Sequence, residues 1–285
     1  MNRKTKAICY ILCSAFCFAM MNTFVRLSGD LPFLQKSFFR NAIALLFASV
    51  VLARTPEKFR FDKGNLPLLL VRASAGTVGL LCNFYAVDHL LLSDASLLNK
   101  LSPFFAILFS FLLLKERLNL IQGLSVLAAF IGALFIIKPT LDFQVVFPYL
   151  VGLLGGMGAG LAYTAVRRLS QRGERGPFIV FFFSLFSCLV TLPPFLLNYR
   201  PMSLLQLGCL ILAGLCAAGG QFSITAAYSN APARDISVFD YTQVLFSALL
   251  GFLFFQQVPD GWSVIGYVII CAVSIGMFQY NRTHN

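Results

Sequence analysis

The sequence predicts an all-α integral membrane protein with ten transmembrane helices arranged as two inverted five-helix repeats. Three observations predict this fold. The composition is 58% hydrophobic and only 12% charged, with a mean hydropathy of +0.80, whereas about a quarter of a typical soluble domain is charged. Apolar runs of about twenty residues, long enough to cross a bilayer as a helix, follow one another along the chain. The chain also contains an internal repeat.

The apolar runs place five spans in each half of the chain. The first repeat, residues 1–141, has spans expected at 7–27, 34–53, 66–88, 93–114 and 119–138. The second repeat, residues 142–285, has spans expected at 148–168, 177–197, 203–228, 232–255 and 261–280. Proline, glycine, asparagine or charged residues separate these runs.

The two halves match at a single offset that includes polar residues. Thr23, Val25, Arg26, Asp94 and Ser96 align with Thr164, Val166, Arg167, Asp235 and Ser237. Because each half has an odd number of spans, the second copy enters the membrane from the opposite side. Inverted repeats of this kind are typical of carriers that hold a small molecule near the midplane and open alternately to either side.

The formal net charge of +11 fits a membrane protein better than a nucleic-acid-binding protein. The basic residues lie in short loops and form no basic stripe interleaved with aromatic residues. Most of them fall on one side if both termini are cytoplasmic, and the positive-inside rule therefore predicts that orientation. We expect a multi-pass protein of the bacterial cytoplasmic (inner) membrane that functions as a monomer.

Charged and polar residues within spans are the candidates for substrate binding, because such groups are costly in a bilayer. Arg40, Lys100, Asp240 and Tyr241 lie about a third of the way into their spans, and Asn99 aligns with Asp240 in the repeat. Continuous helices would place Lys100 about 6 Å above the midplane and Asp240 about 6 Å below it. The alternative for Lys100 is that its ammonium snorkels to the interface.

Asp240 is the candidate coupling group, for a proton or for a cationic part of the substrate, and its alternative role is an interhelical ion pair. Arg40 either binds a carboxylate or phosphate or bonds to backbone carbonyls. Arg72 is expected to snorkel to the interface. Five further residues either bond to the substrate or join helices: Asn22, Asn83, Tyr85, Tyr163 and Gln221.

The sequence offers no basis for an enzyme, a metal site or a cofactor. The two histidines, His89 and His284, lie at a membrane edge and in the tail. The eight cysteines fall inside apolar runs and form no CxxC pair. The glycines of residues 153–161 precede no P-loop lysine, so we interpret them as helix contacts.

The chain resembles the drug/metabolite transporter superfamily, in particular its ten-helix EamA-type branch. The resemblance rests on Tyr85-Ala86, Leu92-Ser93-Asp94-Ala95, Leu101-Ser102-Pro103-Phe104 and Leu114-Lys115-Glu116-Arg117-Leu118. It implies a secondary transporter that moves a small organic metabolite by alternating access. A fainter resemblance to S-adenosylmethionine carriers rests on Phe38-Phe39-Arg40, Asp240-Tyr241 and Pro259-Asp260.

The resemblance does not identify the substrate or the coupling mechanism. Amino-acid-like, S-adenosylmethionine-like and cationic or zwitterionic solutes all fit, as does export of cationic drugs, and coupling is to protons or to solute exchange. A scaffold or sensor is the alternative from another class. Two positions depart from the family pattern: Val244 replaces the proline that would match Pro103, and Gln257 replaces the acid that would match Glu116. Glu116 either couples transport to protons or caps a loop.

Overall fold

The computed structural model describes residues 3–57, 59–114, 120–138, 142–230 and 239–283, and these residues are helical with no strand. The first repeat forms α1 (Arg3–Leu27), α2 (Phe33–Ala53), the 3-10 helix η1 (Lys63–Asn65), α3 (Leu66–His89), α4 (Leu92–Asn99), α5 (Ser102–Leu114) and α6 (Leu120–Ile137). The second forms α7 (Phe143–Gln171), α8 (Gly176–Leu197), α9 (Leu204–Asn230), α11 (Thr242–Phe255) and α12 (Gly261–Thr283).

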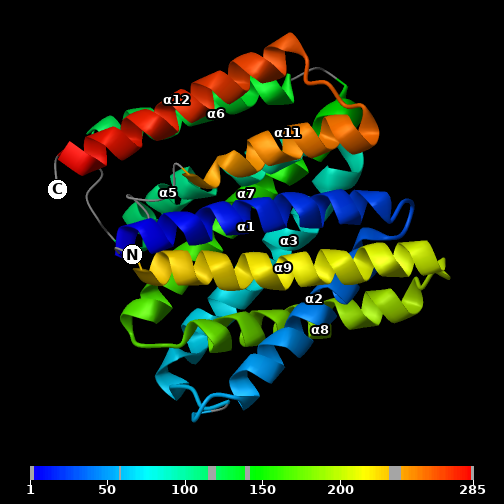
Figure 1. Ribbon diagram of the computed structural model, residues 1–285. Helices are drawn as coiled ribbons and strands as arrows, with labels where there is room; N and C mark the ends of the chain where they lie inside the picture. Colours follow the sequence, from blue (N-terminus) through cyan, green and yellow to red (C-terminus); the bar gives the residue numbers. More distant parts are fainter. Residues whose placement is uncertain (1–2, 58, 115–119, 139–141, 231–238, 284–285) are drawn as a thin grey trace.

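Seven helices of the described residues are long and apolar enough to cross a membrane: α1, α2, α3, α7, α8, α9 and α12. Their lipid-facing sides carry exposed leucine, isoleucine, valine and phenylalanine, which a soluble protein would bury. Both chain ends lie at one face of the bundle (Figure 1), here called the terminal face. The other is called the opposite face.

The helices pack in the pairs that a two-fold relation between the repeats requires. α1 packs on α9 and α3 packs on α7, and these two contacts exchange when the repeats are swapped. α2 packs on α8, and α6 packs on α12 at the far side of the array (Figure 1). Each of these pairs joins one helix from each repeat. The inverted repeat therefore forms one intertwined bundle with its core between the halves.

The expected span 93–114 is broken into two helices. α4 ends at Asn99, Lys100 and Leu101 form a turn, and α5 begins at Ser102. Pro103 explains the break, because its ring has no N–H to donate to the carbonyl of Asn99 and clashes with that carbonyl in a continuous helix.

The related helix of the second repeat turns at the equivalent position. Tyr241 is a turn residue before α11, and its carbonyl accepts the amide of Val244 at 2.9 Å. Val244 is not a proline, so the turn does not depend on one. Both central helices are thus interrupted at the middle of the bundle, where interrupted helices of carriers bind their solutes.

The glycines of α7 serve as helix contacts, as expected. A Cβ at Gly156 would lie 2.3 Å from the carbonyl oxygen of Leu98, and one at Gly158 would lie 2.8 Å from that of Ala75. Only a residue without a side chain lets α7 approach α4 and α3 this closely.

Candidate functional site

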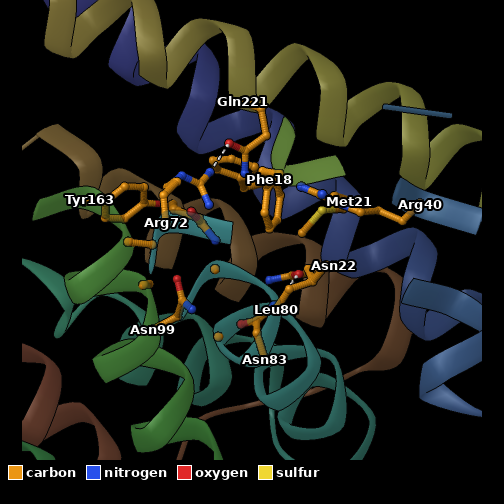
Figure 2. A pocket seen from close by; sticks show the side chains of 16 residues that line it. Phe18, Met21, Asn22, Arg40, Arg72, Leu80, Asn83, Asn99, Tyr163 and Gln221 are labelled. Atoms are coloured by element: carbon orange, nitrogen blue, oxygen red, sulfur yellow. Dashed lines mark hydrogen bonds between the residues drawn. The ribbon is translucent and has the colours of Figure 1, made fainter. Parts of the chain in front are cut away.

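A cavity of about 70 Å³ lies inside the bundle and is lined by both repeats (Figure 2). The polar lining residues are Asn22, Arg40, Arg72, Asn83, Asn99, Tyr163, Gln221 and Gln243. Six of these were predicted from the sequence: Asn22, Arg40, Asn83, Asn99, Tyr163 and Gln221. Arg72 and Gln243 were not assigned to the site.

The position of Arg72 differs from the expected one. Its side chain does not snorkel to the interface but is buried, 4% exposed, and turned into the cavity. Its guanidinium lies 4.2 Å from the ring centre of Phe183 and donates to the Gln221 side chain at 3.5 Å. Gly76, one turn along α3, leaves the space that this side chain occupies, because a Cβ there would lie 2.2 Å from Nη1 of Arg72.

Arg40 is buried at 1% exposure and also lines the cavity. Its guanidinium donates to the Asn41 side chain at 2.6 Å and lies 5.7 Å from the ring centre of Phe183. Asn41 is held in turn by Ser187 of α8 at 2.9 Å. The guanidinium of Arg40 is thus bonded to an amide side chain, whereas the alternative considered was a bond to backbone carbonyls.

The two arginines of the cavity lack a carboxylate partner among the described residues. Other cations in the described part of the chain do form ion pairs: Lys36 with Asp88 at 2.6 Å and Lys100 with Asp240 at 2.7 Å. Nε of Arg40 and Nε of Arg72 are buried without a hydrogen-bond partner. Two fixed positive charges therefore face one cavity, and each has an N–H group available to donate to a ligand.

Amide side chains complete the polar lining. Asn83 donates to Asn22 at 3.2 Å, so that α3 is joined to α1 (Figure 2). Nδ2 of Asn22 and Oε1 of Gln243 are buried without a partner. These groups offer both donors and acceptors to a ligand.

Lys100 and Asp240 do not lie at the separate depths in the membrane that the sequence analysis expected. Nζ of Lys100 lies 2.7 Å from Oδ2 of Asp240, and both side chains are buried at 2% and 1% exposure. The expectation assumed continuous helices, whereas Lys100 and Tyr241 both lie in turns and the lysine stem spans the remaining separation. The interhelical ion pair considered for Asp240 is confirmed, and snorkelling of Lys100 is wrong.

Tyr241 and Tyr85 lie outside the cavity lining. Tyr241 is buried beside the ion pair, at the turn before α11. Tyr85 stacks on His89 with ring centres 4.1 Å apart, near the end of α3 at the opposite face. The side chain of Gln257 accepts the amide of Leu92 at 3.1 Å and so caps α4, while Glu116 lies outside the described residues.

The family comparison identifies the chain. The model of the EamA-like transporter family matches residues 5–138 and again residues 146–279. The chain belongs to the EamA-like transporter family. It is 35% identical over 271 residues to the pseudopaline exporter CntI of Pseudomonas aeruginosa, with 94% of each chain covered. As a member, it is a multi-pass secondary transporter of a small organic metabolite.

More distant relatives support the same class. The riboflavin transporter of Brucella anthropi is 27% identical, with 87% of this chain and 89% of that one covered. Human solute carrier family 35 member G1 is 26% identical, with 96% and 80% covered. A crystal structure with 16% identity superposes with a TM-score of 0.71 over 99% of both chains, which supports the fold. The riboflavin transporter and the solute carrier are transporters, not enzymes.

Proposed function

We propose that this transporter exports a small organic metabolite that carries at least one carboxylate, and that Arg40 and Arg72 hold it. The observation that carries the proposal is the pair of buried guanidinium groups that line the cavity without a carboxylate among the described residues. An uncompensated charge inside a membrane protein is costly and marks a binding site or pathway. Guanidinium matches a carboxylate with two parallel hydrogen bonds.

The charges of the cavity favour an anion over a cation. Asp240, the acid expected to attract a cationic group, is bonded to Lys100 and is not among the lining residues. The lining instead offers two arginines and five amide side chains: Asn22, Asn83, Asn99, Gln221 and Gln243. An amino-acid-derived carboxylate without net positive charge suits this set better than solutes that carry one, such as S-adenosylmethionine or a cationic drug.

The relatives and the fold support the proposal of export by alternating access. The chain shares 35% identity with a protein named as an exporter of pseudopaline. The interrupted helices of the two repeats meet at mid-bundle through Lys100 and Asp240, which suits a site that opens alternately to each face. Because the whole cavity lies within one chain, we propose a functional monomer.

The terminal face is proposed to be cytoplasmic in a bacterial inner membrane. Loops on this face carry the excess of Lys and Arg, as the positive-inside rule requires. A C-terminal fluorescent-protein fusion should be fluorescent and a C-terminal alkaline phosphatase fusion inactive. The reverse pattern would place the termini outside.

Uptake into proteoliposomes tests the substrate class. The labelled panel comprises acidic and neutral amino acids, S-adenosylmethionine, a nucleoside and a lipophilic cation, with and without a pH gradient or internal solute. We expect saturable movement of one or more of the amino acids, and none of S-adenosylmethionine, the nucleoside or the lipophilic cation. Dependence on the gradient or on internal solute distinguishes coupled transport from exchange.

Arginine variants then test the binding groups. Arg40→Ala and Arg72→Ala should each raise KM at least about tenfold, and lysine should restore little because it lacks the planar fork. Arg167→Ala, at an exposed position of α7, is the matched control. Unchanged KM in both cavity variants, or saturable movement of the cation alone, would reject the proposal.

A further inference from the structure

Asp94 differs from the four acids of the described residues that form ion pairs. It is buried at 1% exposure in the first turn of α4, near the opposite face. Asp88, Asp240, Asp260 and Glu57 each form an ion pair with a lysine or arginine. The bonds to the Asp94 side chain come instead from hydroxyl groups.

Hydroxyl groups of α4 and α12 cluster around Asp94. Tyr267 donates to Oδ1 of Asp94 at 2.5 Å and lies 2.7 Å from Oγ of Ser93. Oδ2 of Asp94 is buried without a hydrogen-bond partner. Oγ of Ser263, fully buried on α12, faces the same carboxylate and also that of Asp260. One buried carboxylate oxygen can therefore take up a proton.

We propose that Asp94 is a proton-binding site and that its charge state is transmitted through α4 to the transport cavity. A buried carboxylate that lacks a counter-charge is neutralised most simply by a proton. The charged and titratable groups that face Asp94 are Tyr267 of α12, Tyr149 of α7, and Lys138 with Asp260 at the surface. Lys138 binds Asp260 at 2.7 Å, so its charge is already shared.

The surface ion pair gives the proton a route to Asp94. Lys138 and Asp260 are 35% and 49% exposed at the opposite face, and the Asp260 carboxylate accepts the amide of Ser263 at 3.0 Å. Asp94 therefore lies directly beneath a pair that water reaches. Separation of this pair opens the Asp94 site to the aqueous phase.

α4 connects this site to the cavity. Asp94 lies in its first turn, and Asn99, its last residue, lines the cavity. Lys100, the next residue, bonds to Asp240 of the other repeat. When Asp94 is ionised it holds the Tyr267 hydroxyl and so fixes α4 to α12. Protonation weakens that bond and frees this short helix to move with the cavity.

Trp262 allows proton binding to be measured without a substrate. It is the only tryptophan in the sequence and precedes Ser263 on α12. Its emission in the purified, full-length protein should change in one reversible step as the pH is lowered. Asp260 titrates only in strong acid, because its bond to Lys138 lowers its pKa to about 2.

Three variants decide whether the step belongs to Asp94. Asp94→Asn should abolish it, whereas Asp88→Asn, which removes an acid paired with Lys36, should keep it. Tyr267→Phe should move the midpoint upward by about one pH unit, because the lost hydroxyl stabilises the charged carboxylate. The same step in Asp94→Asn, or no step in the wild type, would overturn the proposal. If Asp94→Asn does not fold, an unshifted midpoint in Tyr267→Phe overturns it.

A sodium titration and a transport measurement complete the test. A response to Na⁺ at constant pH would contradict a proton site and indicate a metal-ion site. The coupling to transport rests on the proposed function: Asp94→Asn should bring the ratio of uptake with and without a pH gradient to about one, with exchange retained. A variant that keeps the wild-type ratio would refute the coupling. Failure of every carboxylate in the panel would reject the substrate class but leave the fluorescence result intact.

Discussion

At the scale of single residues, the cavity depends on two arginines near the ring of Phe183. Arg40 could be predicted from the sequence as a site residue, because a charged side chain well inside a span is costly and usually functional. Arg72 was misassigned because a sequence gives the depth of a side chain but not the direction in which it points. Gly76 could have indicated the direction of the Arg72 side chain, since a small residue one turn away on α3 leaves room for a long side chain.

Gly76→Ala should impair transport without unfolding the protein. The new Cβ would meet Nη1 of Arg72 at 2.2 Å and the Phe183 ring at 3.0 Å, so the guanidinium must leave its position in the cavity. We expect KM for the carboxylate substrate to rise several-fold, with the elution profile in size-exclusion chromatography unchanged.

Gly276→Ala is the control for this change, because nothing lies within 4 Å of the added carbon at that position of α12. Wild-type KM in Gly76→Ala would show that the position of Arg72 does not set substrate affinity.

At the scale of helices, the spans could be predicted but their interruption was not. Pro103 is visible in the sequence, and its ring disfavours a continuous helix through Asn99. The second break, at Tyr241, could not be predicted in this way, because no proline follows it at the matching position. Treating both helices as continuous separated Lys100 from Asp240 in depth, whereas the turns bring the two side chains together.

The Lys100–Asp240 pair should stabilise the fold mainly by keeping its two charges matched. Lys100→Met or Asp240→Asn alone leaves one buried charge uncompensated, and each should cost about 3–5 kcal/mol in the free energy of unfolding. The double variant should recover a large part of that loss.

Thermal unfolding in detergent measures all three variants. Additive losses in the double variant would mean that the two side chains are not coupled, and a pH-dependent transport defect in Asp240→Asn alone would support its predicted role in coupling.

At the scale of the whole molecule, the two-fold arrangement was predicted because polar residues recur at one offset in a chain of ten apolar runs. The pairing of α1 with α9 and of α3 with α7 follows from that repeat. The charge of the cavity could not be predicted, because it depends on which of the buried cations form ion pairs with acidic residues. Lys100 forms one with Asp240, whereas Arg40 and Arg72 remain available for a substrate.

The most direct test of this central claim compares a transported carboxylate with its neutral carboxamide in proteoliposomes. Wild-type protein should favour the carboxylate at least about tenfold in kcat/KM, which corresponds to about 1.4 kcal/mol, and Arg40→Ala and Arg72→Ala should lose most of that preference. Equal transport of the two compounds by the wild type, or a preference that survives both substitutions, would contradict the account.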